Sequence, residues 1–312
     1  MATAEARDAA AAGLAHARTA LAGNPSDGYG GATLAVTIDA FVAHAALVPE
    51  GRSGRSIPLL DATVRRFDRE LGRDSRGLAL TWRTSIPQCV GLGGSSAIVI
   101  AALRALCTHH GVELAPDRLA ALALAVETEE LGIVAGLQDR VAQAYGGLTF
   151  MEFDRSRTGD GPRYEQLDPG LLPPLAVAWR TDGDRRPSGV VHGDLRARFD
   201  RRERRVVRAM RVLGDAARQA RDALLRADTT AFAECVDATF ELRASILVLD
   251  RDDLALVSRA REAGAAANYT GSGGAIVAVC RDDRHREAVL ASLGGAPACD
   301  AIAVALASDL SA

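Results

Sequence analysis

A glycine- and serine-rich loop stands directly before a long apolar run in Ile86–Leu103, IPQCVGLGGSSAIVIAAL. Backbone N–H groups can converge at Gly91, Gly93 and Gly94 because these residues lack a Cβ, and a helix starting near Ser96 would add the positive end of its dipole. The loop can therefore bind an anion such as a phosphate, although alone it is equally compatible with a simple helix cap. It does not fit the dinucleotide-binding motif, since Ser96 stands where G-x-G-x-x-G needs its third glycine.

Two further glycine-containing segments favour phosphate binding. The sequence LGIVAGLQDRVAQAYGG, which begins at Leu131, places Asp139 between glycine turns, and GSGGA, Gly271–Ala275, is a second glycine-rich turn far along the chain. A carboxylate beside a phosphate loop can act as a general base, although an aspartate at this position could also be a helix cap. Together the three segments predict one cleft.

Composition excludes several kinds of enzyme. All 37 basic residues are arginine, and without lysine the chain cannot be a Walker A nucleotide-binding protein, a protein kinase or a Schiff-base enzyme. The net charge of -3 gives no reason to expect a nucleic-acid partner. Five cysteines without a paired or metal-binding spacing, and no apolar run long enough for a membrane span, favour a protein of the cytoplasm.

Hydrophobic patterning predicts the elements that position these segments. We expect residues 3–21 to form a helix, or a helix running into a short strand, because they are rich in alanine. The further expected helices and strands follow from apolar periodicity and β-branched runs: strand character at 32–48, 78–86 and 146–153 and after Gly274, and helices at 61–71, 97–107 and 116–130 and repeatedly within 195–263.

These elements show no regular βαβ order, so we expect an α+β protein of two lobes with the site in the cleft between them. The boundary is expected within Leu167–Pro174, which gives domains of residues 1–170 and 171–312. The segment SGVVHGDLRARF is expected to be a loop before a helix capped by Asp194, although its glycines could also hinge a lid.

The sequence resembles the GHMP small-molecule kinases, and in particular the glucuronokinase branch of that family. The resemblance lies in ARTALAGNPSDGYGG, IPQCVGLGGSSAIV, LGIVAGLQDRVAQAYGGL and TGSGGAIVAVC, which occur in the family's order between Ala17 and Cys280. It implies a two-lobed kinase that uses ATP and magnesium to phosphorylate a small molecule. The branch implies a uronic acid, most simply glucuronate at its anomeric hydroxyl, as the acceptor.

The resemblance also implies roles for individual residues. Asp139 matches the catalytic aspartate and Arg18 the arginine that orients it, while Ser96 and Glu127 match the magnesium ligands. Because this chain has GLGGSSA where most relatives have GLGSSA, Ser95 remains an alternative to Ser96, and Glu129 and Glu130 remain alternatives to Glu127. The residues expected to contact the nucleotide form one set: Gly91, Leu92, Gly93, Gly94, Ser95, Ser96, Ala97 and Gly273.

Acceptor binding is expected to involve Asp27 and Tyr29 of GNPSDGYGG, together with Gly274. Turn chemistry alone would also account for this segment. Asn24-Pro25 replaces the Glu-His of many sugar kinases, which fits the glucuronokinase branch and argues against galactokinase. A uronate carboxylate would suit a bidentate arginine, and Arg196 is the candidate chosen from several.

Two alternatives remain open from the sequence. The phosphate-transfer residues could serve another sugar or a small alcohol, or the fold could belong to a catalytically silent regulator that binds nucleotide or sugar. The apparent presence of Asp139, Arg18 and Ser96 argues against the silent regulator. We expect a small-molecule partner, no membrane association, and either a monomer or a homodimer.

Overall fold

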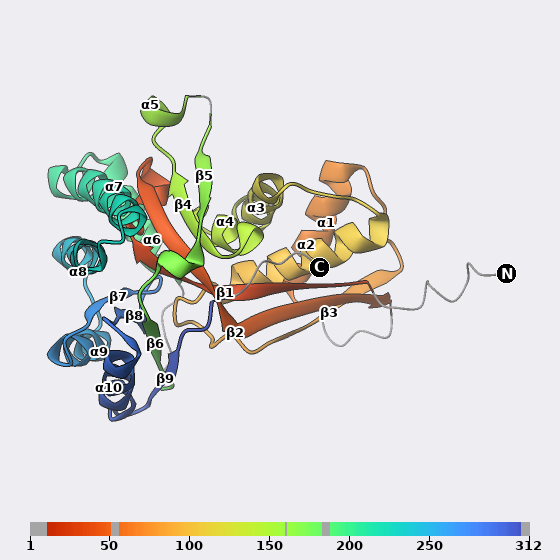
Figure 1. The fold of residues 1–312 in the computed structure, drawn as a ribbon. Helices are drawn as coiled ribbons and strands as arrows, with labels where there is room; N and C mark the ends of the chain where they lie inside the picture. Colours follow the sequence, from red (N-terminus) through yellow and green to blue (C-terminus); the bar gives the residue numbers. More distant parts are fainter. Residues whose placement is uncertain (1–10, 51–55, 160, 183–187, 307–312) are drawn as a thin grey trace.

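The computed structural model describes residues 11–50, 56–159, 161–182 and 188–306, and two antiparallel sheets organise this part of the chain (Figure 1). The first sheet has the order β1-β2-β4-β5, with β3 also paired to β2. The long strand β2 makes this possible, because one edge pairs with β1 while the other pairs with β4 at its start and β3 at its end. The strands are β1 (Ala12–Ala22), β2 (Ala32–Pro49), β3 (Leu78–Thr84), β4 (Leu148–Glu152) and β5 (Arg163–Leu167).

The second sheet is built from later residues and has the order β7-β8-β6-β9. Its strands are β6 (Leu175–Arg180), β7 (Ala266–Tyr269), β8 (Ala275–Val279) and β9 (Cys299–Ala303). Helices of the same half of the chain accompany it: α6 (Ser188–Asp200), α7 (Arg204–Leu225), α8 (Thr229–Ile246), α9 (Arg251–Glu262) and α10 (Asp283–Gly294). Figure 1 shows α8, α9 and α10 together on one side of β6–β9.

Helix α2 (Gly94–His110) forms the centre of the first half because it is apolar on nearly every side and is buried against β1 and β2. The approach to β1 is close: a Cβ on Gly13 would lie 2.2 Å from the carbonyl oxygen of Ala101, so only glycine fits there. The neighbouring helices are α1 (Pro58–Leu71), α3 (Pro116–Ala125) and α4 (Gln138–Tyr145), with the short α5 (Arg155–Thr158) beyond β4. This packing fixes the start of α2, which follows the glycine loop.

The expected α+β architecture is confirmed, and so are the strands and helices expected in and around the glycine segments. Of the two alternatives expected at residues 3–21, a helix throughout is wrong where the structure describes it, because β1 starts at Ala12; a helix running into a strand agrees with the structure in its strand part. Alanine favours a helix locally, but this segment pairs with β2 along almost its whole length, and that pairing decides its conformation. Residues 1–10 lie outside the described part.

The expected helix cap at Asp194 is also wrong. Helix α6 already includes Ser188, so Asp194 lies in its interior, where its carboxylate is 3.7 Å from the guanidinium of Arg198 one turn later. Between α3 and α4, the helix expected to reach Glu130 changes to a π-helical turn at Val126–Glu130. This turn carries Glu127.

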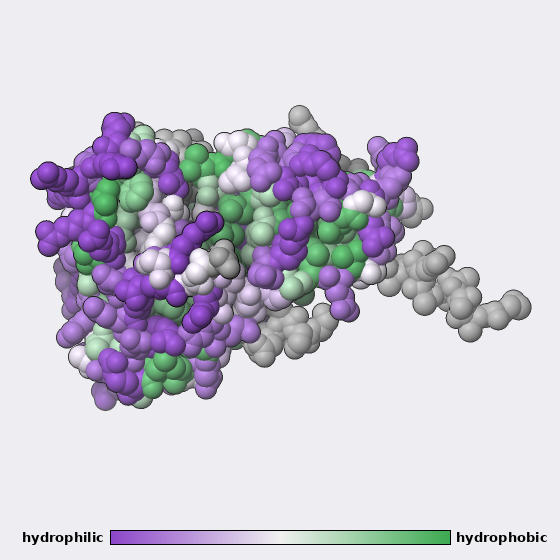
Figure 2. Space-filling view, turned by 90° about the horizontal axis from the view of Figure 1, so that it is seen from above, coloured by the Kyte–Doolittle hydropathy of each residue, from purple (hydrophilic) through white to green (hydrophobic). Residues whose placement is uncertain are grey.

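Hydrophilic residues cover much of the face shown in Figure 2, and hydrophobic residues appear on it in separate areas. Among the helices of the described residues, none combines the length and the apolar character that crossing a membrane requires. The apolar residues instead form the buried clusters between helices and sheets.

Candidate active site

The two glycine-rich turns lie against each other. Gly91 has a φ of 75°, and a Cβ on it would lie 3.0 Å from both the Gly273 carbonyl oxygen and the Ser272 nitrogen. From the other side, a Cβ on Gly271 would lie 2.4 Å from the Gly91 carbonyl oxygen. The two segments, about 180 residues apart in the sequence, therefore meet backbone to backbone, which only glycine allows.

Arg18 joins these turns to Asp139. Its Nε and Nη2 each lie 2.7 Å from Oδ1 of Asp139, and its Nη1 donates to the carbonyl oxygens of Gly91 and Thr270 at 2.7 and 2.8 Å. The Arg18 residue is only 3% exposed, whereas the Asp139 side chain is 24% exposed. Arg18 thus holds a partly accessible carboxylate at the junction of the two glycine turns.

The start of α2 presents two serines with different surroundings. Ser95 is exposed, and its hydroxyl donates to Oε1 of Glu127 at 2.9 Å. Ser96 is fully buried, and its hydroxyl donates to the Gly93 carbonyl oxygen at 3.0 Å. Oε2 of Glu127 in turn accepts from Arg140. The exposed hydroxyl beside a carboxylate is therefore that of Ser95.

Glu127 differs from Glu129 and Glu130 in its burial and in its arginine partner. It is 1% exposed and faces Arg140, whose pKa burial lowers to about 10. Glu129 instead pairs with Arg66, and Glu130 with Arg69, and both arginines belong to α1. Among the described residues no group of three or more His, Cys, Asp or Glu side chains could hold a metal ion.

Asp27 lines a cavity of about 560 Å³. Its Oδ2 accepts a hydrogen bond from the backbone N–H of Gln138 at 3.2 Å, which places it beside the start of α4. A Cβ on Gly136 would lie 2.1 Å from this oxygen, so glycine at 136 makes room for the carboxylate. Burial, opposed in part by the Gln138 hydrogen bond, raises the pKa of Asp27 to about 6, with the Asp139 charge as a further cause.

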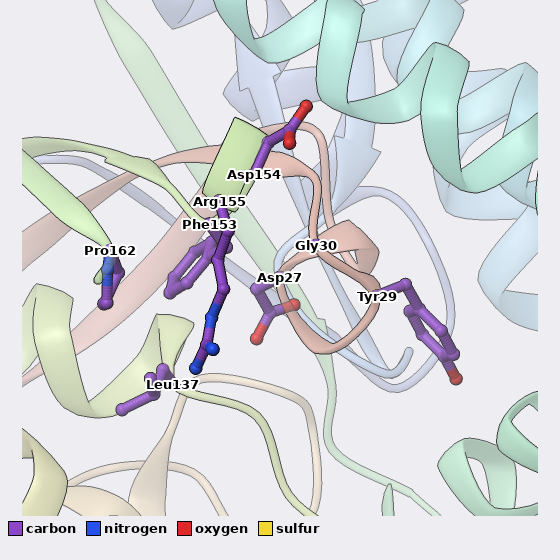
Figure 3. A pocket seen from close by; sticks show the side chains of 8 residues that line it. All are labelled: Asp27, Tyr29, Gly30, Leu137, Phe153, Asp154, Arg155 and Pro162. Atoms are coloured by element: carbon purple, nitrogen blue, oxygen red, sulfur yellow. The ribbon is translucent and has the colours of Figure 1, made fainter. Parts of the chain in front are cut away.

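The cavity lies between the turn that carries Asp27 and the connection from β4 to β5, and Figure 3 shows the side chains around it. Asp27 and Arg155 point into the cavity, whereas Asp154 points away from it. The described lining residues are Asp27, Tyr29, Gly30, Leu137, Phe153, Asp154, Arg155 and Pro162.

Tyr29 and Arg196, both expected to bind acceptor, lie together at the edge of the cavity. The Tyr29 ring points away from Asp27 (Figure 3), with Arg196 above it at 4.6 Å and the Phe199 ring 4.6 Å from it. Burial raises the pKa of Tyr29 to about 12. Arg196 donates to the Gly28 carbonyl oxygen at 2.6 Å, so it supports the turn that carries Asp27.

Gly274 is not free to contact an acceptor through its backbone. Its N–H donates to Asp253 at 2.8 Å, and its carbonyl oxygen accepts from the N–H of Arg180. Gly273, by contrast, lies at the contact with Gly91. The structure thus brings Gly273 to the loop that contains Gly91 and places Gly274 within the fold of the second sheet.

Sequence reasoning missed three groups that complete this arrangement. Arg140 pairs with Glu127. The Gln143 side chain donates to the Gly93 carbonyl oxygen at 2.8 Å, and the Thr270 hydroxyl donates to the Gly91 carbonyl oxygen at 3.0 Å. Gln143 lies one turn after Asp139 on the same helix, and this spacing could have identified it. Thr270 gave no such signal, because its partner is distant in the sequence.

Comparisons with known proteins agree with this geometry. The family model "GHMP kinases N terminal domain" matches residues 58–147, and "GHMP kinases C terminal" matches residues 213–297. Glucuronokinase 1 of Arabidopsis thaliana is 34% identical over 85% of this chain and 83% of its own length. Probable glucuronokinase 2 of the same organism is 35% identical over 85% and 82%.

Solved structures show the same fold at low sequence identity. Lactococcus lactis galactokinase, in a complex with galactose, superimposes with a TM-score of 0.78 at 17% identity and covers 97% of this chain and 95% of its own. L. major mevalonate kinase gives a TM-score of 0.74 at 19% identity, with coverage of 96% and 97%. With both family models and two relatives that each match over 85% of the chain in agreement, the chain belongs to the GHMP kinases and is a small-molecule kinase.

Proposed function

We propose that this protein transfers the γ-phosphoryl group of ATP to the anomeric hydroxyl of glucuronate or a closely related uronic acid. Its glucuronokinase relatives support the acceptor class, and GHMP kinases are ATP-dependent. The observation that carries the proposal is the position of Asp139. Arg18 holds it at the two glycine turns, and the adjacent residue, Gln138, binds Asp27 at the cavity.

The phosphate side of the reaction follows from the glycine turns. Phosphoryl transfer passes through a loose, anionic transition state, so a kinase must mainly align the reactants and neutralise charge. Backbone N–H groups of Gly91–Ala97 would surround the triphosphate at the positive end of the α2 dipole, with Gly273 against them. Arg18 adds a buried cation that remains fixed by its hydrogen bonds to both turns.

The acceptor side follows from the two aspartates. Asp139 would accept the proton of the attacking hydroxyl or hold that hydroxyl in line, since it is partly accessible and fixed in orientation by Arg18. Asp27 would accept a hydrogen bond from another hydroxyl of the sugar. Tyr29 and Arg196 would support the Asp27 turn from the side of α6.

Magnesium fits the pair formed by Ser95 and Glu127, because hydroxyl and carboxylate oxygens are ligands that this ion prefers. We assign the serine position to Ser95 rather than Ser96, whose hydroxyl is enclosed and bonded to Gly93. When bound, the ion would neutralise phosphate charge, and phosphate oxygens and water would complete its coordination. Arg140 orients Glu127 for this role.

Two coarser assignments accompany this function. We propose residues 1–170 and 171–312 as the two domains, supported by the separate sheets that end at Leu167 and begin at Leu175. We also propose a cytoplasmic location, supported by the five cysteines, all of which are free thiols.

An ATP-consumption assay on glucuronate, galacturonate, glucose, mevalonate and homoserine tests the proposal. We expect uronate turnover, with phosphorus NMR assigning the new phosphate to the anomeric position. Asp139→Asn should lower kcat about 10²- to 10⁴-fold while nucleotide binding and the unfolding midpoint persist. Asp283→Asn, which removes an exposed carboxylate on α10, should leave the rate unchanged. Equal inertness of wild type and Asp139→Asn on every acceptor, with ATP still bound, would instead indicate a silent regulator.

A further inference from the structure

Arg155 is the cation of the acceptor cavity. It begins α5, in the connection between β4 and β5, and Figure 3 shows its side chain extending past Phe153 toward Leu137, on the side where the Asp27 carboxylate lies. Of the described residues that line the cavity, Arg155 alone carries a positive charge. No ion pair or side-chain hydrogen bond joins it to another residue in the described part of the chain. Its guanidinium is therefore available to a ligand.

Other arginines near the site already have partners. Arg18 binds Asp139 and both glycine turns, and Arg140 binds Glu127. Arg196 stacks on Tyr29 and donates to Gly28, while Arg243 is buried and donates to the carbonyl oxygen of Gly271. A ligand carboxylate that recruited one of these four would have to displace contacts that maintain the site.

The two acidic residues of the cavity, Asp27 and Asp154, also have other partners than Arg155. Asp154 accepts hydrogen bonds from the N–H and hydroxyl of Ser156, lies 3.6 Å from Arg157, and points away from the cavity. Asp27 accepts a hydrogen bond from the backbone N–H of Gln138. The cavity thus offers one carboxylate for a sugar hydroxyl and one unengaged guanidinium. A neutral hexose has no group that requires the guanidinium, whereas a hexuronate has a carboxylate that matches its planar donor pair.

We propose that Arg155 binds the carboxylate of the acidic sugar and so determines the preference for uronates over neutral hexoses. The cavity volume of about 560 Å³ is within the usual range for small-molecule sites. The inference rests on the proposed function and extends it to a specificity residue that lies outside all the family motifs found in the sequence. It also replaces Arg196, whose guanidinium supports the Asp27 turn.

Glucuronate and glucose test this directly, because they differ only at C6. Arg155→Gln should raise the KM for glucuronate about 10- to 100-fold, the usual loss for one hydrogen-bonded charge, and change kcat less than about threefold. Glucose, followed as a substrate or as a competitive inhibitor, should bind both proteins equally. Arg155→Lys should fall between them, since it keeps the charge but loses the bidentate geometry.

Arg157→Gln is the matched control. Arg157 lies two residues away on the same short helix, is also exposed, pairs with Asp154 and does not line the cavity, so its loss should leave the KM for glucuronate unchanged. If wild type is active on glucuronate and Arg155→Gln and Arg157→Gln have equal KM values for it, the role of Arg155 is overturned while the proposed function stands. An equal loss for glucuronate and glucose would do the same, because it would indicate a structural effect. A wild type active only on neutral acceptors would overturn the proposed function as well.

Discussion

The ionisation of Asp27 should weaken the folded state, and Asp27→Asn should remove this effect. The pKa of the carboxyl is raised from 3.8 to about 6 in the folded protein, mainly by burial. Between these values the native state holds a proton that the unfolded chain has released, so the free energy of unfolding falls as pH rises through this window. A difference of about two pKa units corresponds to about 3 kcal/mol at most. This penalty is complete above the folded pKa and absent below pH 3.8.

Urea unfolding of wild type and Asp27→Asn from pH 4.5 to pH 8 measures this linkage. The stability of the variant relative to wild type should increase by about 2 kcal/mol between these pH values, because about 1 kcal/mol of the penalty is already present at pH 4.5, and its KM for the acceptor should rise. Asp154→Asn is a control without pH dependence in this range, because hydrogen bonds from Ser156 lower the pKa of Asp154 from 3.8 and its contribution to stability is therefore complete at pH 4.5. If the Asp27→Asn difference stayed constant or decreased with pH, the carboxyl would not have a raised pKa and the reasoning would fail.

Two further predictions concern the phosphate loop. Ser95→Ala should raise the magnesium concentration for half-maximal activity about tenfold. Ser96→Ala should leave that concentration unchanged and lower the free energy of unfolding by about 1 kcal/mol. A magnesium effect confined to Ser96→Ala would refute the assignment. Gly91→Ala should destabilise the protein by about 1–2 kcal/mol and raise the KM for ATP, because it adds backbone strain and a contact with Gly273. Gly72→Ala, at a similar φ of 60° but in open space, should show the strain without the change in KM, and equal effects of the two variants in both assays would contradict the proposed contact.

The sequence predicted features that depend on local chemistry. Glycine spacing in Gly91–Ala97 predicted an anion-binding loop before a buried helix, and the absence of lysine excluded other nucleotide-binding classes. The residues around Asp139 were recognisable because the turn before it, from Leu131 onward, the start of α4 and the carboxylate itself are contiguous in the chain. The α+β class followed from apolar patterns of two periods, which reflect what each segment can bury.

Other features depend on partners that are distant in the sequence. The described part of the segment expected at residues 3–21 to be mainly helical forms β1, because pairing with β2 outweighed the local preference of alanine. Ser95 and Ser96 are chemically identical, and only the packing of α2 decides which hydroxyl faces Glu127 and which is enclosed. Adjacent helical residues point about 100° apart, so sequence position alone cannot make this choice.

The sequence by itself determined which chemistry this protein can perform, because glycine, serine and aspartate in short contiguous motifs carry that information locally. Only the tertiary structure showed which of the arginines are already paired and which is open to a ligand. Arg18 is buried among three acceptor atoms drawn from three segments, whereas Arg155 remains unengaged at the cavity among the residues described. All arginines carry the same charge, and only the folded arrangement of their neighbours determines whether that charge is already paired or open to a ligand.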